Sequence, residues 1–555
     1  MSATLFESNL QRVLLAITAV LVLYPVGWIL FVSVTPSGQF SFASYVHLFT
    51  EGALVKSFVN SIGVATASSL IALLFGVPLA FLAVRTDLRY RRFISLFAMV
   101  PFITPAFIGG LAWVVLGAPR TGILNLAGKW LGLSEPWLNI YSLHGMIFTL
   151  GIYMSPYVFV LTSAVLSAID PTLEEAAAVS GSGPLSVIRS VVLPLATPGI
   201  AAAALLAFLN SVEQFGIPAI LGRPANVFVL PTEIYSLMNR LPPDTSQASS
   251  AAVLLLVLSA AAVALQQNMI SRRSYVTITG KGFRQQKFDL GKWRYAAYMF
   301  VGTYAVIAVG LPVLALLLSS FLVAGTITLT GNSFSLQHYA YLFDSYPATT
   351  RSLVNGFVYS AIGATVALVL AALSAYFIAR YRTVLTWLMR TILMFPLVLP
   401  GIVIGTGLLL AYIRPPIVLY GTMWILVVSY ITRFLPFAER ASAAALQQID
   451  RSLEEASVVC GASWLTTVWT VLVPLIRPAL VGGWLLLFVS MLRELGTSVL
   501  LYSFGQEVPA VVLFDLLDSG NMGAMSAYAN ILLAISIAIV VGFQKLLRSE
   551  FAPSG

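Results

Sequence analysis

The chain has 555 residues, of which 59% are hydrophobic and only 9% are charged, with a net charge of +9. Soluble domains average about 45–50% apolar and about 25% charged residues, so this composition excludes a soluble globular protein and indicates an integral membrane protein. The single cysteine excludes an intramolecular disulfide framework, and we attribute the positive charge to membrane topology rather than to nucleic-acid binding.

Twelve apolar stretches are each long enough to cross a bilayer, which takes roughly 20 residues. In the first half they cover about residues 13–34, 61–84, 94–117, 143–167, 197–219 and 249–267. In the second half they cover about residues 297–322, 356–379, 391–413, 419–439, 476–500 and 525–544. The first stretch is too long for the apolar region of a signal peptide, so we expect it to be the first span.

Basic residues mark one side of the membrane. Arg12 precedes the first span, and Lys and Arg concentrate in the turns that follow even-numbered spans, whereas the other loops hold few of them. Because basic loops stay in the cytoplasm, we expect both termini to be cytoplasmic. The sequence therefore predicts a multi-pass protein of the bacterial inner membrane.

The chain is an internal duplication. Arg85 is echoed by Arg380, and the prolines at 101 and 105 by those at 396 and 400, always 295 positions apart. Prolines inside a membrane helix free backbone groups, either as packing kinks or as hinges that line a path. Farther along the chain the repeat offset falls to 280, so the first half carries fifteen extra residues. We place them in an outer loop at about residues 118–140, whose role the sequence does not give.

The duplication predicts the domain organisation. Six spans per half make both halves enter the membrane from the same side, which gives a parallel repeat. We expect a first half at residues 1–275, a basic cytoplasmic linker at 276–294, and a second half at 295–555. The predicted fold is therefore an all-α membrane protein of about twelve transmembrane helices, arranged as two parallel six-helix repeats.

Two polar segments, at about residues 168–195 and 448–475, match each other and stand out from their apolar surroundings. The first contains Glu174, Glu175, Ala176, Ala177 and Gly181, and the second contains Glu454, Glu455, Ala456, Ser457 and Gly461. In each copy the glycine is followed after twelve residues by a proline, at 194 and 474. One copy alone fits a well-capped loop, but two matched copies favour a shared function.

Each polar segment predicts a short helix, a turn and a second helix. Asp170 and Asp450 can start the first helix, and Thr172 and Ser452 each precede a glutamate at capping-box spacing. The glycines at 181 and 461 suit the left-handed residue that ends a helix. Ser463 and, in the first copy, Pro184 suit the start of the second helix, which Pro194 and Pro474 should end.

This pattern resembles the signature loop of ABC importer permeases, with Ser457 in place of an alanine and Val473 in place of a leucine as mild departures. The resemblance implies that each loop is a coupling helix that docks in a cleft of a separate ATPase subunit. It therefore implies two ATPase copies, with ATP and magnesium bound there and no cofactor on this chain. The chain itself has no phosphate-binding loop and no recognisable catalytic motif, so we expect it not to be an enzyme.

Ionisable and polar residues also fall within two predicted spans. The first set is Asn210, Ser211, Glu213 and Gln214, and the second is Arg493 and Glu494, at the repeat offset of 280. Charges inside a membrane must face protein or water. They could form a polar clamp between the halves, or an acidic lining of a translocation path suited to a cation. The three histidines, at 47, 144 and 338, are scattered, and no metal site is assigned.

The whole chain resembles a fused permease of the type I ABC importers, and the Arg493-Glu494-Leu495-Gly496-Thr497-Ser498 run is most similar to ferric iron importer permeases. Because the outer loops are too short for a substrate-binding domain, the resemblance implies a periplasmic binding protein as a further partner. Thiamine, a polyamine or an oxyanion such as a phosphonate remain alternative substrates. A secondary transporter is a different class, because it has no need of paired ATPase-docking loops.

Overall fold

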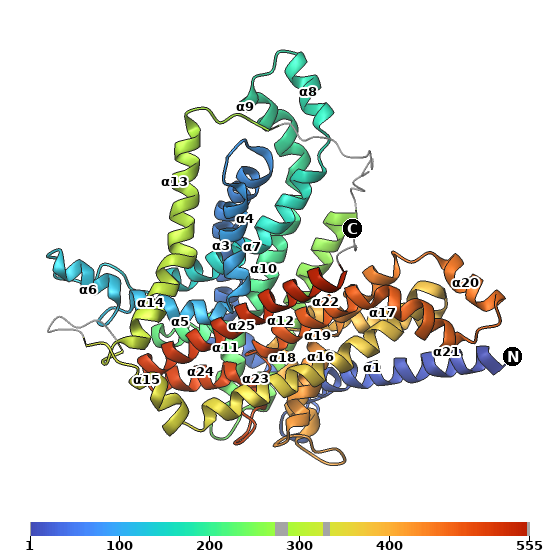
Figure 1. The fold of residues 1–555 in the computed structure, drawn as a ribbon. Helices are drawn as coiled ribbons and strands as arrows, with labels where there is room; N and C mark the ends of the chain where they lie inside the picture. The colour runs from blue at the N-terminus through green and yellow to red at the C-terminus, as the bar shows by residue number, and fades with distance from the viewer. Residues whose placement is uncertain (1, 51, 272–286, 326–332, 552–555) are drawn as a thin grey trace.

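The structure, a computed structural model, describes residues 2–50, 52–271, 287–325 and 333–551, and the central part of the predicted linker lies outside these residues. The described regular structure is helical, with only two isolated β-bridges (Figure 1). Nine described helices are long and apolar enough to cross a membrane, or up to eleven segments when two bent helix pairs are included. This confirms the predicted all-α membrane fold.

Every predicted span has a helical counterpart. In the first half these are α1 (Ser2–Val34), α3 (Gly52–Arg85), the pair α4 (Arg91–Ile103) and α5 (Ala106–Gly117), α7 (Leu143–Ala168), α10 (Leu193–Glu213) and α12 (Thr245–Ser271). In the second half they are α13 (Trp293–Ala305) with α14 (Leu311–Phe321), α16 (Ala348–Arg380), the pair α17 (Val384–Met394) and α18 (Gly401–Tyr412), α19 (Met423–Leu446), α22 (Val473–Leu492) and α25 (Met522–Phe551). Helix α19 is outside the nine because it carries Arg433, Glu439 and Arg440.

The two halves form diverging arms. Helices α3, α7 and α10 pack together in one arm, and their repeat counterparts α16, α19 and α22 pack together in the other. Figure 1 shows α8 (Pro171–Val179) and α9 (Pro184–Val187) at the far end of the first arm. It shows α20 (Arg451–Val459) and α21 (Trp464–Thr467) at the far end of the second. The two matching polar segments are therefore held far from each other.

The first span of each half crosses to the other half. Helix α1 packs against α17 and α18, while α13 and α14 pack against α4 and α5. The Tyr304 hydroxyl lies 2.8 Å from the Ser155 hydroxyl across this contact. At the start of α1, Glu7 accepts a hydrogen bond from the Tyr381 hydroxyl at the end of α16. The predicted halves are thus continuous in sequence but interlocked in space, and the N-terminus lies on the side of the polar segments.

Two predicted spans, 94–117 and 391–413, are not single helices. Each is a pair of helices bent sharply, by 96° in the first half and 111° in the second. Pro105 and Pro400 occupy the N-cap positions of α5 and α18. A proline fixes φ and has no N–H to donate, so each first helix ends before it and a new helix starts. The sequence identified the prolines but not the size of the bends.

Three other prolines do not interrupt their helices. Pro194, Pro312 and Pro474 each follow a five-residue π-helical segment, at Ile188–Val192, Val306–Gly310 and Val468–Leu472. A π segment changes the hydrogen-bond pattern locally, which accommodates the missing N–H while the helix continues. The prediction that Pro194 and Pro474 end the second short helix was therefore wrong. Each polar segment leads directly into a long helix, α10 or α22.

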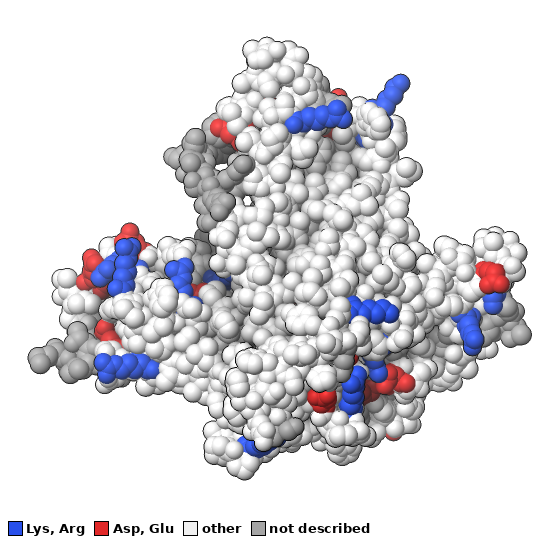
Figure 2. All heavy atoms as spheres, turned by 180° about the vertical axis from the view of Figure 1, so that it is seen from behind, with Lys and Arg blue, Asp and Glu red and all other residues white. Residues whose placement is uncertain are grey.

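Most of the charged side chains seen on the surface lie toward the ends and edges of the molecule. On the face shown in Figure 2 they gather mainly at the ends of the arms and around the lower edge, and the surface between them carries few charges. Many large apolar side chains are exposed on the long helices, among them Leu70, Leu74 and Leu486, each more than 60% exposed. Exposed apolar surface of this extent fits contact with lipid.

Candidate functional site

Each polar segment folds into a hairpin of two helices whose first helix starts directly after Asp170 or Asp450, as predicted, although the predicted capping boxes do not form. A carboxylate oxygen of Asp450 accepts from the Ser452 N–H at 2.9 Å, and Asp170 accepts from the Thr172 N–H at 2.9 Å. The helices start at residues 171 and 451, so Thr172 and Ser452 already lie in the first turn and the predicted capping boxes do not form. The hydrogen bond from Ser452 lowers the pKa of Asp450.

The glycine turns match the prediction. Gly181 and Gly461 have φ of +84° and +85°, in the left-handed region that favours glycine. The next N–H groups, of Ser182 and Ala462, donate to carbonyls five residues earlier, at 3.0 and 3.1 Å. These bonds close each first helix in a Schellman-type end. In the second hairpin the Ser463 hydroxyl caps α21 by accepting from the Thr466 N–H at 3.2 Å.

The two adjacent glutamates of each hairpin face opposite ways. Glu174 and Glu454 are buried, at 3% and 9% exposed, whereas Glu175 and Glu455 are exposed. Glu174 forms an ion pair with Arg85 at 2.8 Å, and Glu454 forms one with Arg380. Burial raises the pKa of Glu174, and the neighbouring Arg85 opposes this shift. Of the predicted coupling glutamates, only the second of each pair is on the surface.

The exposed face of each hairpin is partly apolar. Val179 and Val459, which are repeat counterparts, are 89% and 87% exposed at the ends of α8 and α20. Further exposed apolar side chains on the hairpins are Leu173, Leu453, Val458, Leu465 and Trp469. Ala176 and Ala456 are also exposed, and Ala177 and Ser457 are half-buried. Exposed, partly apolar hairpins of this kind fit a protein-docking surface.

The predicted intramembrane residues lie where helices end rather than inside them. Helix α10 ends at Glu213 and α22 ends at Leu492, so the predicted spans 197–219 and 476–500 are too long by several residues. In both halves the chain then turns and continues to a short helix that was not predicted, α11 (Leu230–Met238) in the first half and α24 (Pro509–Asp518) in the second. The charged positions thus mark matching helix breaks in the two halves.

Arg493 joins the two halves at the first bend. Its guanidinium Nη1 donates to the Ile103 carbonyl at 2.6 Å and to the Phe102 carbonyl at 3.4 Å. These carbonyls belong to the end of α4, which the bend leaves without helical partners. The arginine of the second half therefore satisfies backbone acceptors of the first half. This geometry agrees with a clamp between the halves.

Glu494 is held by its own half at the second bend. Its carboxylate pairs with Arg433 Nε at 3.0 Å and accepts from the Thr497 N–H at 3.1 Å, and Glu494 is 8% exposed. A Cβ at Gly401, the first residue of α18, would lie 2.3 Å from Arg433 Nη1. Gly401 thus leaves room for the ion pair at the start of α18. Arg433 lay within a predicted span, and its charge was the signal that the sequence analysis did not use.

The first-half residues are less constrained. Glu213 is partly exposed and makes no ion pair or hydrogen bond with residues that the structure describes. It lies within electrostatic reach of Arg433 and Glu494. The Ser211 hydroxyl is buried without a hydrogen-bond partner, while the Asn210 amide donates back to the Leu206 carbonyl at 2.8 Å. Gln214 follows Glu213 in the turn, so the end of α10 carries an unpaired carboxylate and, two residues earlier, an unpaired buried hydroxyl.

Beyond these breaks, on the side away from the hairpins, aromatic rings from the two halves meet. Phe215 and Tyr235 of the first half each contact Phe514 of the second, with ring centroids 6.1 Å apart in both pairs. The Arg223 guanidinium lies over Tyr235 and Phe514, at 5.7 and 6.0 Å from their centroids. This aromatic layer closes the contact between the halves, and no motif in the sequence indicated it.

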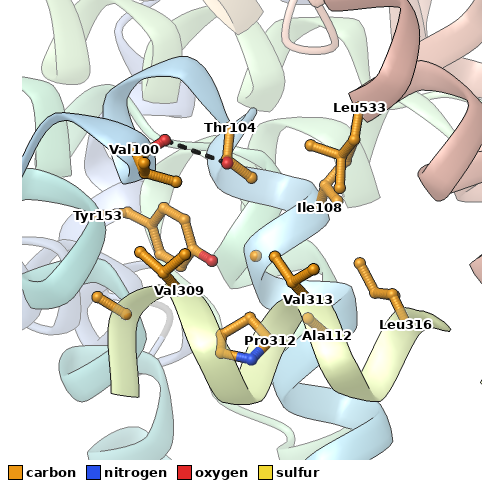
Figure 3. A pocket seen from close by; sticks show the side chains of 12 residues that line it. Val100, Thr104, Ile108, Ala112, Tyr153, Val309, Pro312, Val313, Leu316 and Leu533 are labelled. Carbon is orange, nitrogen blue, oxygen red and sulfur yellow. Dashed lines mark hydrogen bonds between the residues drawn. The ribbon is translucent and has the colours of Figure 1, made fainter. Parts of the chain in front are cut away.

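A small apolar cavity also lies between the halves. Figure 3 shows Tyr153 of α7 pointing into it, with Ile108 of α5 and Val313 and Pro312 of α14 around it. A Cβ at Gly109 would lie 1.8 Å from the Tyr153 ring, so this glycine permits the close packing. Its apolar lining makes the cavity a packing feature rather than a site for a charged substrate. In the described part of the chain, no group of three His, Cys, Asp or Glu side chains is placed to hold a metal ion.

Comparison with known proteins finds one matching family, several long relatives and solved structures that cover part of the chain. Residues 69–275 and 367–549 match the family described as binding-protein-dependent transport system inner membrane component. The ferric transport system permease protein of Actinobacillus pleuropneumoniae is 27% identical over 540 residues, which cover 96% of this chain and 77% of that relative. The Fe(3+)-transport system permease protein of Haemophilus influenzae is 22% identical over 470 residues, covering 84% and 85%. A solved bacterial ABC transporter for the import of alginate is 22% identical, with a TM-score of 0.35, over 45% of this chain and 88% of that chain.

The ion pair between Arg433 and Glu494 gives a stability prediction. Arg433→Gln leaves the Glu494 carboxylate buried without a cation, and breaking a buried pair in this way costs about 3–5 kcal/mol. The double variant Arg433→Gln/Glu494→Gln should recover most of this loss. The measurement is the free energy of unfolding of the purified protein in detergent.

Arg451→Gln is the matched control, because its ion pair with Glu455 is 66% exposed on both sides. Such an exposed helical pair contributes only about 0.3–0.5 kcal/mol. Equal losses in the single and double variants at 433 and 494 would contradict the account of this pair.

Proposed function

The chain belongs to the family of binding-protein-dependent transport system inner membrane components, and from this premise we propose that it is the membrane permease subunit of an ATP-driven ferric iron importer. The observation that carries the proposal is the pair of matching hairpins, one at the far end of each arm. A transporter driven by two ATPase subunits needs two such docking points. Since both are on one chain, one copy should suffice for two ATPase copies.

The hairpins are proposed to dock in clefts of the ATPase subunits. Glu175, Glu455 and the apolar residues Val179 and Val459 supply the exposed surface, and each glycine turn ends the first helix of its hairpin. The long helices α10 and α22 start directly from the hairpins. Movement of a docked hairpin would therefore pass along a continuous helix to Glu213 or Arg493. ATP and magnesium would be bound by the partner subunits, and no cofactor by this chain.

Alternating access is the proposed mechanism. The aromatic layer of Phe215, Tyr235 and Phe514 closes one side, while the hairpin ends of the arms diverge. This arrangement supports a state open toward the hairpins. Closure of the ATPase dimer would draw the hairpins together, separate the aromatic layer, and admit substrate from a periplasmic binding protein. The hairpins and both termini would then face the cytoplasm, in agreement with the basic turns.

Ferric iron as substrate rests on two observations. Long relatives of this chain are named as ferric transport permeases. Glu213 and Ser211 are also oxygen donors without partners beside the junction of the halves, and hard cations prefer oxygen donors. Asn210 and Gln214 would add weaker contacts, whereas Arg493 and Glu494 would hold the junction. An organic cation or an oxyanion is the outcome that the uptake experiment below must exclude.

Docking is tested by changing the exposed tips of the hairpins. Val179→Asp with Val459→Asp should reduce co-purification of the partner ATPase at least tenfold, because it places charge on an apolar contact surface. The fold should be retained, since both side chains are almost fully exposed.

Leu241→Asp is the control, because Leu241 is 97% exposed but lies on the side opposite to the hairpins. Normal ATPase recovery with the double valine variant would count against docking through these tips.

Substrate identity is tested by uptake of radiolabelled ferric iron into cells that lack their own ferric importer. The cells express this chain with its partner ATPase and binding protein, and unlabelled thiamine and spermidine serve as competitors. We expect saturable, ATP-dependent uptake that neither competitor reduces. Glu213→Gln should lower the uptake at least tenfold, because it removes the unpaired carboxylate from the path.

Glu135→Gln in an exposed outer loop is the matched control and should transport normally. An assembled complex that takes up no iron would contradict the substrate, and competition by thiamine or spermidine would identify the alternative. Uptake that continues without the ATPase would instead indicate a secondary transporter.

A further inference from the structure

Each hairpin is joined to its arm by a buried ion pair in addition to its chain connections. Arg85, the last residue of α3, lies 2.8 Å from Glu174 of α8, and the two side chains are 0% and 4% exposed. Arg380, the last residue of α16, pairs in the same way with Glu454 of α20, and these side chains are 15% and 11% exposed. The same pair of residue types joins the same two elements in both halves.

The recurrence is informative because the intervening chain differs. The arginines are 295 positions apart and the glutamates 280, since the first half carries fifteen extra residues between them. The extra residues belong to the outer loop that includes α6 (Ile123–Trp130), at the opposite end of the arm. The ion pair is therefore preserved across the two repeats although its partners are differently spaced in sequence.

Neighbouring groups support both pairs. Arg85 Nη2 also donates to the Ile169 carbonyl at 3.4 Å, at the start of the hairpin, and the Arg85 carbonyl accepts from the Phe288 N–H at 2.8 Å. In the second half the Tyr376 hydroxyl donates to the Glu454 carboxylate at 3.3 Å. The end of α3 is thus joined to the hairpin and to the segment that leads into the second half.

A buried ion pair adds little net stability, because burial removes the water around both charges. Its directional contacts nevertheless fix the orientation of the groups that it joins. We infer that Arg85 and Arg380 are positioning residues that hold the first glutamate of each hairpin inward, so that the exposed glutamate faces the ATPase and hairpin and arm move together. The inference deepens the proposed function, since the role of the arm movement depends on a docked ATPase.

The packing of the arms explains why this position matters. Helix α3 packs on α7 and α10, and α16 packs on α19 and α22. Without the ion pair, each hairpin is still attached through a short non-helical link from α7 or α19, and through α9 or α21 with the π segment that follows. In the second half Trp464 also stacks on Phe377 of α16, with ring centroids 6.1 Å apart. The short link and the π segment both depart from regular helix, so a hairpin held without the ion pair could tilt relative to the arm. With the ion pair, the end of α3 or α16 holds the hairpin as well.

The test uses Cys460, which is exposed at the end of α20 and is the single cysteine of the chain. A nitroxide attached there reports the mobility of the second hairpin by EPR without any engineered cysteine. Arg380→Glu should increase nitroxide mobility, and the swap Arg380→Glu/Glu454→Arg should restore the slower motion. Arg382→Glu, an exposed position two residues away, makes the same charge change and should leave the spectrum unchanged.

A second experiment measures transport by the complex of this chain with its ATPase. Arg85→Glu with Arg380→Glu should lower ATP-dependent transport of radiolabelled ferric iron at least tenfold, and the fourfold swap with both glutamates changed to arginine should recover at least a third of it. Wild-type nitroxide mobility in Arg380→Glu, together with wild-type transport in Arg85→Glu/Arg380→Glu, would overturn the inference. Charge swaps that restore neither the slower nitroxide motion nor the transport would also overturn it. A wild-type chain that recovers no ATPase would overturn the proposed function instead, and the EPR result would still decide the role of the ion pair.

Discussion

A helix that breaks inside a membrane leaves carbonyl and N–H groups that no water can satisfy, and the centre of this protein is organised around two such breaks. In the first half the free carbonyls at Phe102 and Ile103 accept from Arg493 of the other half. In the second half the start of α18 leaves room for the Arg433–Glu494 pair only because residue 401 is glycine. Arg493 thus satisfies backbone groups at the first break, and the Arg433–Glu494 pair packs against the second.

This constraint makes the two halves unequal, although they derive from one repeat. The position of Arg493 is occupied in the first half by Glu213, and that of Glu494 by Gln214. Arg493 and Glu494 are engaged, whereas Glu213 has no partner among the described residues. A duplicated scaffold can therefore use one copy of a position to join the halves and leave the other copy for a substrate. A symmetric pair of identical chains could not divide these tasks.

The sequence predicted the elements well where the determinants are local. The glycine turns, the Ser463 cap and the span positions follow from residues close together in the chain. It failed where a proline had two possible outcomes, because Pro105 ends a helix while Pro194 is absorbed by a π segment. It also missed contacts between distant residues, such as the aromatic layer around Phe514 and the pairing of Arg85 with Glu174. Arg85 recurs in the repeat as Arg380, but sequence spacing alone does not identify its partner.

We propose that the hairpins approach each other when the partner ATPase binds ATP. Ser180 and Cys460 are repeat counterparts at the tips of the two hairpins, and both are exposed. Spin labels on Ser180→Cys and on the native cysteine, in the complex in lipid nanodiscs, would report the distance between the hairpins by double electron–electron resonance. We expect a shorter distance with ATP under conditions that block hydrolysis than without nucleotide. An unchanged distance in a complex that hydrolyses ATP normally would contradict the proposed approach of the hairpins.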